Sequence, residues 1–91
     1  MPDIERYENT DWDLVSSVKA SKRRRQILQA VQKQPRMNGE LADELDLSTA
    51  YVRRNMNWLE EHELVEDLTE SKANYKLYGI TELGEEITEY L

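Results

Sequence analysis

A chain of 91 residues is long enough for one small domain with a modest core and too short for two. The sequence contains no cysteine and one histidine, His62, which excludes disulfides, thiol redox chemistry and a zinc site built mainly on Cys and His ligands. No apolar run approaches the roughly 20 residues of a membrane span, and the first residues lack a signal-peptide core, so we expect a cytoplasmic protein without metal or cofactor.

The net charge of −7 is unevenly distributed along the chain. Between residues 19 and 36 every charged residue is a cation: Lys19, Lys22, Arg23, Arg24, Arg25, Lys33 and Arg36. The acids gather in the first thirteen residues, around residues 40–46 and after Glu60. The negative total therefore does not exclude a nucleic-acid partner. An acid-rich surface over a small core also suits a cytoplasm of very high salt.

Residues 1–10 are polar and have no clear period, so we predict a flexible N-terminal arm followed by one domain over residues 11–91. Thr10 and Asp13 have the spacing of a capping box, which predicts a short helix from this point. Trp12 and Val15 would share one side of that helix. Trp12 could stack on a ligand, but a core or subunit-contact role is favoured.

The next helix is predicted from Ser21, a preferred N-cap, to about Gln34, where Pro35 prevents easy continuation. Its first turn contains Lys22, Arg23, Arg24 and Arg25. Cations at that end oppose the helix dipole, at a cost of roughly a few tenths of a kcal/mol per charge. Contact with DNA phosphates is one interpretation of this basic turn, and a solvated turn that balances acidic neighbours is the other.

Residues 39–65 contain two blocks of apolar residues at helical spacing, separated only by the short segment 46–48. The blocks are Leu41, Ala42 and Leu45, then Val52, Met56 and Leu59. Ser48 is a preferred N-cap, and Asp46 tolerates a left-handed turn conformation. The pattern predicts a helix starting at Met37 or Asn38, a tight turn, and a second helix from Ser48 to about Glu61.

The second helix has a polar outward face. A spacing of about 100° per residue turns Val52, Met56 and Leu59 inward and places Thr49, Ala50, Arg53, Arg54 and Asn57 on the other side. Arginine can bond guanine bidentately and asparagine can bond adenine, so this face suits the DNA major groove. A simple solvated face is equally open from the helix alone. Tyr51 could contact DNA or pack, whereas packing is favoured for Trp58.

From Leu64 the period changes to the alternation typical of strands. Residues 64–69 and 75–80 form two such runs around a polar loop, which predicts a β-hairpin. Thr81 would cap a last helix with acids in its first turn. The apolar stripe of that helix, Leu83, Ile87 and Tyr90, is either core or a dimer seam.

A helix-turn-helix followed by a hairpin is the element order of a winged helix. The residues that carry a closer likeness are Ala20-Ser21-Lys22 with Arg24, Ile27 and Leu28; Glu40-Leu41-Ala42; Leu47-Ser48 with Val52, Arg54, Met56, Leu59 and Glu60; Leu64-Val65-Glu66; and Tyr78-Gly79-Ile80-Thr81-Glu82-Leu83-Gly84. Through them residues 11–91 resemble the small archaeal winged helix-turn-helix transcription regulators related to the MarR and ArsR groups. The acidity is similar to that of the haloarchaeal members, including the phage-repressor-like ones.

The resemblance implies a mainly helical fold with a small β-hairpin, in the order α-α-α-α-β-β-α, and a dimeric DNA-binding regulator. The helix from Ser48 would enter the major groove. The implied base contacts are Thr49, Ala50, Arg53 and Asn57, with Ser48 and Tyr51 beside them and Arg54 on a phosphate. The hairpin tip would lie near the minor groove with Lys72, Asn74 and Lys76.

Three features depart from the family pattern. Asp46 and Glu63 stand where glycines are usual, so we expect both helix ends to be closed differently. The wing carries no arginine at its tip and offers Lys72 and Lys76 among acidic neighbours.

Together these observations predict a sequence-specific DNA-binding transcriptional regulator, a repressor, acting as a homodimer on an inverted repeat. Its dimer contacts are expected at Trp12, Val15, Leu83, Ile87 and Tyr90. The alternative is a winged-helix interaction module of a transcription or replication assembly, which the acidic surface and the weakly basic wing favour. An enzyme is not expected, because the sequence has no nucleophile motif, phosphate loop or paired acid and base.

Overall fold

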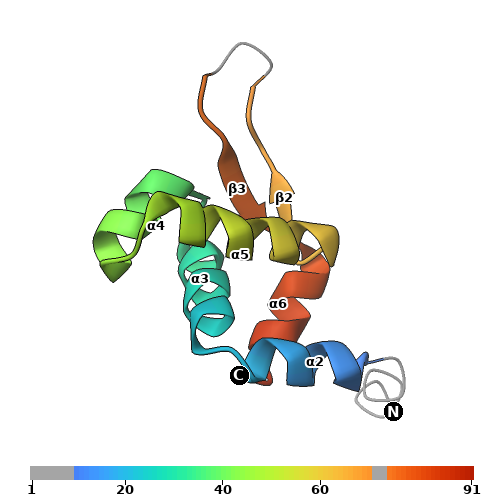
Figure 1. Cartoon of the computed structure of the whole chain (residues 1–91). Helices are drawn as coiled ribbons and strands as arrows, with labels where there is room; N and C mark the ends of the chain where they lie inside the picture. The colour runs from blue at the N-terminus through green and yellow to red at the C-terminus, as the bar shows by residue number, and fades with distance from the viewer. Residues whose placement is uncertain (1–9, 71–73) are drawn as a thin grey trace.

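The computed structural model describes residues 10–70 and 74–91. In chain order its elements are α2 (Trp12–Lys19), α3 (Lys22–Lys33), β1 (Arg36–Met37), α4 (Asn38–Leu45), α5 (Thr49–Glu61), β2 (Val65–Asp67), β3 (Leu77–Ile80) and α6 (Glu82–Thr88). In Figure 1 α5 crosses the molecule, the β2–β3 wing projects beyond it on one side, and α2 lies at the opposite end. The predicted fold, mainly helical with a hairpin in winged-helix order, is confirmed. Residues 1–9 of the predicted arm and Lys72 lie outside the described residues.

The helix starts follow from capping side chains. The hydroxyl oxygen of Ser21 accepts a hydrogen bond from the Arg24 amide at 3.2 Å, and that of Ser48 accepts one from the Tyr51 amide at 3.1 Å. Thr81 caps α6 in the same way, with 2.9 Å between its hydroxyl oxygen and the Gly84 amide nitrogen. Each bond satisfies an amide that has no partner within its helix.

The predicted cap of the first described helix was wrong by one residue. Asp11, not Thr10, caps α2, because its carboxylate accepts from the Leu14 amide at 3.0 Å. Asp11 has the extended backbone of an N-cap, and its negative charge also interacts favourably with the positive end of the helix dipole. The Thr10 hydroxyl lies instead 3.4 Å from the Tyr90 hydroxyl.

The ends of α4 and α5 are closed in the left-handed conformation that a glycine would adopt. Asp46 has φ 56°, which confirms that it adopts the left-handed turn conformation predicted as tolerable there, and Glu63 has φ 61°. The expectation that both ends are closed in a way different from glycine was therefore wrong. After each of them a leucine amide bonds back into the helix: Leu47 to the Ala42 carbonyl and Leu64 to the Leu59 carbonyl, both at 2.9 Å. A left-handed residue costs roughly 1–2 kcal/mol. Full burial of Leu64 stabilises by about as much or more, which explains why Glu63 is tolerated.

The core lies where α3, α5, the sheet and α6 meet. Its fully buried side chains are Val18, Ile27, Leu28, Val31, Leu41, Val52, Met56, Leu59, Leu64, Val65, Tyr78 and Ile87. The inward face predicted for α5 is therefore confirmed. The apolar stripe of the last helix is core at Ile87, while Leu83 and Tyr90 are partly buried against that core.

The sheet contains a strand that the predicted element order lacks. The described strands form one antiparallel sheet in the order β1-β3-β2, with Arg36 opposite Tyr78 and Val65 opposite Ile80. β1 has two residues, too few for an alternating pattern, and it exists because β3 offers a free edge beside it. The Arg36 side chain is buried at this edge and forms an ion pair with Glu44 of α4.

Candidate nucleic-acid interface

The exposed face of α5 forms a polar ridge on the surface. We define the α5 ridge as Thr49, Ala50, Arg53, Arg54 and Asn57, all of which are exposed. The opposite side of the helix is anchored in the core through Val52, Met56 and Leu59. Helical periodicity therefore gathers these five predicted contact residues on one face. Ser48 lies at the start of the ridge, where its hydroxyl oxygen is engaged as the N-cap.

Tyr51 lies beside the start of the ridge with 36% of its surface exposed. Its backbone carbonyl accepts a hydrogen bond from the Asn55 amide group at 2.9 Å, which holds Asn55 along the helix. The tyrosine ring is thus presented at the surface and is available for contact. Trp58, by contrast, is half-buried, as predicted.

A broad depression separates the α5 ridge from the wing. This wing-side groove has a volume of about 870 Å³ and runs between the start of α4, one flank of α5 and the two wing strands. Its described charged residues are Glu40, Arg53, Asp67, Glu70 and Lys76. The charges are mixed, with more acids than cations, so the groove is a poor general attractant for phosphate.

Asp67 is held as a carboxylate on the wing side. Its Oδ1 accepts a hydrogen bond from the Thr69 amide at 2.8 Å, and the bonds from Thr69, with Lys76 as a smaller cause, lower the pKa of Asp67. The positive charge of Lys76 is therefore opposed by a fixed negative neighbour. Lys76 and Asn74, two of the predicted wing contacts, are exposed and line this groove.

Tyr78 extends from β3 to the same groove. Only 1% of its surface is exposed, and burial, together with the nearby charges of Glu60 and Asp67, raises the pKa of its hydroxyl. The group is neutral at ordinary pH and adds no charge to the groove. The buried Tyr78 side chain therefore forms an uncharged part of the groove lining between the wing and α5.

A second, smaller depression lies on the other flank of the ridge. This α3-side notch has a volume of about 430 Å³ and is lined by Arg24, Arg54, Asn55, Asn57, Trp58 and Glu61. Asn57 lines both the notch and the wing-side groove. The α5 ridge is therefore a crest between two hollows. One hollow is walled by the wing and the other by the start of α3.

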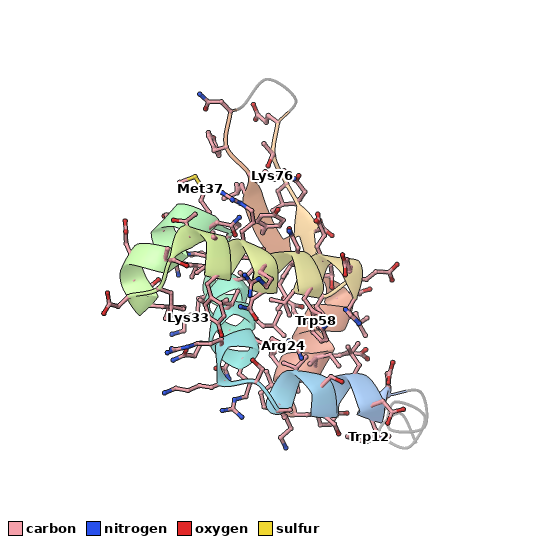
Figure 2. The ribbon with its side chains drawn as sticks, viewed as in Figure 1. Trp12, Arg24, Lys33, Met37, Trp58 and Lys76 are labelled. Atoms are coloured by element: carbon pink, nitrogen blue, oxygen red, sulfur yellow. The ribbon has the colours of Figure 1, made fainter. Side chains whose placement is uncertain are left out.

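Arg24 is fixed in the notch by two contacts. Its guanidinium carbon lies 3.8 Å from the centre of the Trp58 ring, and its Nη1 donates to the Ser17 carbonyl at 3.1 Å. Trp58 also stacks on the His62 ring, with 4.0 Å between ring centres and 26° between planes. Trp58 is therefore in contact with both Arg24 and His62. In Figure 2 the labelled Arg24 and Trp58 lie next to each other, between α5 and α2.

Of the other two arginines of the basic turn, Arg25 closes the junction between α2 and α3, and Arg23 bonds within α3. Arg25 Nη1 donates to the Lys19 carbonyl at 2.6 Å, and Arg23 Nη1 donates to the Gln26 side chain at 2.9 Å. Arg24 and Arg25 thus satisfy carbonyls at the C-terminal end of α2 that have no partner within that helix. Lys22 is exposed. The sequence pattern did not indicate this closing role, because it depends on how the two helices meet.

Two exposed wing residues were also missed. Tyr75 has 54% and Leu68 has 43% of its surface exposed. Tyr75 lines the wing-side groove, whereas Leu68 is exposed elsewhere on the wing, beside Gly79. The signal was present in the sequence as apolar residues next to the polar loop, but it was interpreted only as strand propensity.

The residues predicted to form a dimer contact divide into two groups. Val15 and Ile87 are buried in the core of the single chain, with 4% and 1% exposed. Trp12 is 48% exposed and meets the Tyr90 ring edge-on, with 4.9 Å between ring centres. Leu83 and Tyr90 are partly buried. The exposed apolar surface at this end of the molecule is therefore centred on Trp12.

Other kinds of site have little support among the described residues. In residues 10–70 and 74–91, no group of three or more His, Cys, Asp or Glu side chains is arranged to hold a metal ion. Within the same ranges no helix has both the length and the apolar character that a membrane crossing requires. The α5 ridge with its two hollows is the strongest candidate for an interface.

Known structures with this fold include regulators. A transcriptional regulator HlyU from Vibrio vulnificus is 26% identical over 98% of this chain and 90% of that one, with a TM-score of 0.67. The homodimeric winged helix-turn-helix DNA-binding domain of Mb0332 from Mycobacterium bovis, a possible ArsR-family transcriptional regulator, is 25% identical over 82% of this chain and 66% of that one, with a TM-score of 0.67. These descriptions name regulators and no enzymes, in agreement with the prediction of a protein that is not an enzyme.

The ZitR structure from Lactococcus lactis, a C30AH42A mutant, is 23% identical with a TM-score of 0.69, and it supports the fold alone. The match covers 76% of this chain, which spans about half the length of ZitR, 48%. A search of curated protein sequences gave no significant match. A protein-family model, described as the HVO_A0261 N-terminal domain, matches residues 12–91. This match covers every described element, and the chain belongs to the HVO_A0261 N-terminal domain family.

Proposed function

We propose that the protein is a sequence-specific DNA-binding transcriptional regulator that places the α5 ridge in the major groove. The observation that carries the proposal is the ridge itself, on which Arg53, Arg54 and Asn57 are exposed on a helix whose other side is anchored in the core. The likeness to HlyU and Mb0332, described as a transcriptional regulator and a DNA-binding domain, supports it.

The ridge has the chemistry of base recognition. Arg53 and Asn57 are four residues apart on one face, a rise of about 6 Å along the helix. This separation lets their side chains reach different base pairs. Arginine would bond the O6 and N7 acceptors of a guanine, and asparagine would bond the N6 and N7 groups of an adenine. Thr49 and Ala50 are small enough to allow close approach and contact with a thymine methyl group.

The hollows on either side of the ridge suit the shape of a duplex. A helix in the major groove is flanked by two sugar-phosphate backbones, one on each side of a groove about 12 Å wide. In the proposed complex one backbone lies toward the α3-side notch and the other toward the wing-side groove. The wing would then approach the neighbouring minor groove with Asn74, Tyr75 and Lys76.

We further propose that the protein acts in the cytoplasm as a homodimer and represses transcription by occupying an inverted repeat. Half-sites one helical turn apart, roughly 34 Å, would match two copies of α5 related by a two-fold axis. The exposed apolar surface around Trp12, which meets the Tyr90 ring, is the proposed dimer contact, and the partly buried Leu83 of α6 is a further proposed contact. Occupancy of a promoter would exclude the polymerase or a basal factor.

The test is selection of binding sites from a random duplex pool, followed by titration of the selected and a random duplex by fluorescence anisotropy. The variant Arg53→Ala/Asn57→Ala is expected to lose most of the preference for the selected duplex, by about tenfold or more, because each base contact contributes about 1–3 kcal/mol. Lys33→Ala is the matched control, since it removes a charge from the exposed far end of α3.

Two outcomes would contradict the proposal. Selection could yield no enriched sequence, or the double variant could retain the full preference. In the first case a protein partner would be sought by cross-linking at the α5 ridge, which is the test of the interaction-module alternative.

A further inference from the structure

The α3-side notch brings together two guanidinium groups from different helices. Arg24 comes from the first turn of α3 and Arg54 from the middle of α5, and the Asn57 amide lines the same depression. Guanidinium groups recognise phosphate oxygens through paired N–H donors. Glu61, exposed at the same lining, is the one acid among the described residues there. The notch is thus a locally positive hollow on a chain whose net charge is −7.

Arg24 is already arranged for binding before any ligand arrives. One of its five N–H donors is used on the Ser17 carbonyl, and its guanidinium carbon lies over the Trp58 ring, 3.8 Å from the ring centre. The His62 ring stacks on Trp58, and its Nδ1 lies 2.8 Å from the Trp58 carbonyl oxygen, to which it donates. These two contacts hold the guanidinium of Arg24, with its remaining donors, at the wall of the notch. A ligand does not have to order this side chain, which lowers the entropic cost of binding.

Arg54 completes the arrangement from the other wall. It is exposed, so its guanidinium can move toward a bound group without breaking a buried contact. The two arginines therefore have different roles, one fixed and one adaptable. The position of the notch directly beside the α5 ridge is where a backbone phosphate would pass if α5 lay in the major groove.

We propose that the α3-side notch binds one phosphodiester group of the DNA backbone, with Arg24 as the preorganised donor and Arg54 as the second donor. This inference rests on the proposed function and deepens it. The contact would set the register of α5 in the major groove, because Asn57 lines the notch and also belongs to the base-facing ridge. The basic turn then contributes to DNA binding mainly through Arg24, while Arg25 bonds the Lys19 carbonyl of α2 and Arg23 bonds Gln26 within α3.

The test uses the duplex selected by the wild-type protein, prepared as a series in which one phosphate at a time is replaced by a neutral methylphosphonate. Dissociation constants are measured by anisotropy for the wild type, Arg24→Gln, Arg54→Gln and the control Lys33→Gln. In the wild type we expect one position per half-site at which neutralisation weakens binding by about tenfold, the scale of a charge-assisted hydrogen bond. Neutralising that same phosphate should weaken the binding of Arg24→Gln and of Arg54→Gln by less than about twofold. It should weaken the binding of Lys33→Gln by the same factor as in the wild type.

Salt dependence provides an independent measurement. Arg24→Gln should reduce the slope of log affinity against log salt by about 0.9 for each phosphate that the protein no longer neutralises, and Lys33→Gln should leave it unchanged. Arg24→Lys keeps the charge but loses the paired N–H donors and the contact of the planar guanidinium with Trp58. It should therefore recover the salt slope of the wild type without recovering its full affinity. Circular dichroism checks that each variant is folded. Because Arg54 is exposed, Arg54→Gln decides the question if Arg24→Gln unfolds.

The outcomes separate the two proposals. Suppose that the wild type binds its duplex, and that Arg54→Gln and a folded Arg24→Gln are still weakened about tenfold by every methylphosphonate that weakens the wild type. The notch proposal is then wrong and the proposed function stands. If the wild type binds no duplex, both are wrong.

Discussion

The two flanks of α5 differ in how their charges are held. On the α3 side, two arginines face one acid, and Arg24 is fixed by a carbonyl and an aromatic plane. On the wing side, Arg53 and Lys76 face Glu40, Asp67 and Glu70, and the Asp67 carboxylate is held by Thr69. A strongly acidic chain can therefore still hold a locally positive hollow where its cations are fixed by groups other than acids.

The base of the wing side should be the most sensitive part of this arrangement. A Cβ on Gly84 would collide with the Leu64 carbonyl oxygen and approach Ile80 Cγ1 to 2.7 Å, where α6 passes the foot of the wing. We expect Gly84→Ala to lower the free energy of unfolding by about 2–3 kcal/mol or more, the scale of overpacking in a core. Thermal and urea unfolding measure this effect. Gly39→Ala is the control, because nothing lies within 4 Å of its added methyl group; equal losses in both variants would show that the predicted collision is relieved.

Arg53 and Arg24 should separate sequence preference from general affinity. Arg53→Ala is expected to weaken binding to the selected duplex by about 1–3 kcal/mol and to change binding to a random duplex much less, because the bond to a base edge is removed. Arg24→Ala is expected to weaken both duplexes similarly, because a backbone contact is independent of sequence. Parallel titrations of the two duplexes measure these losses. Equal behaviour of the two variants would remove the distinction between the ridge and the notch.

Neutralising the acids of the wing-side groove should strengthen DNA binding. Asp67→Asn/Glu70→Gln removes two negative charges from the hollow through which a backbone would pass. We expect affinity at low salt to rise by a few fold, about 1 kcal/mol, and the gain to vanish near 1 M salt, where the Debye length is about 3 Å. Glu86→Gln, an exposed site on α6, is the matched control. A loss of affinity in the double variant would mean that these acids contact DNA directly.

The smallest effect concerns the pH dependence of the wing. The Thr69 hydrogen bonds lower the pKa of Asp67, so any stability that this carboxylate contributes is present above its unfolded pKa, about 3.9, and is lost as pH falls through the lower folded pKa. The Thr69 amide shift in an NMR titration should therefore change with a midpoint below 3.9. A midpoint at or above the value in a short peptide would show that the Asp67–Thr69 bond does not persist in solution.

Local sequence was sufficient for most of the helices and for the ridge. Ser21, Ser48 and Thr81 were predicted as caps, and each accepts the expected amide, because a cap acts over three residues. The buried and exposed faces of α5 followed from the helical period alone. The choice of Asp11 over Thr10 was missed, since both have the right chemistry and the difference lies in where the chain enters the helix.

The candidate site was predictable as a set of residues but not as a surface. The sequence indicated Arg53, Arg54 and Asn57, and it indicated the basic turn as a separate cluster. That Arg24 lies on Trp58, thirty-four positions away, and shares a hollow with Arg54 depends on the crossing of α3 and α5. No pattern within either helix encodes that crossing.

By itself the sequence determined the order of the helices and the hairpin, the caps Ser21, Ser48 and Thr81 and the buried side of α5, because these depend on hydrogen bonds and periodicities spanning a few residues. The tertiary structure alone decided the two-residue strand β1, the buried Arg36 that pairs with Glu44, and the left-handed Glu63 made tolerable by the burial of Leu64. The tertiary structure also decided which basic side chains lie near acidic ones and which do not. Each of these depends on groups from separate elements, whose interaction energies exist only after the core has brought the elements together.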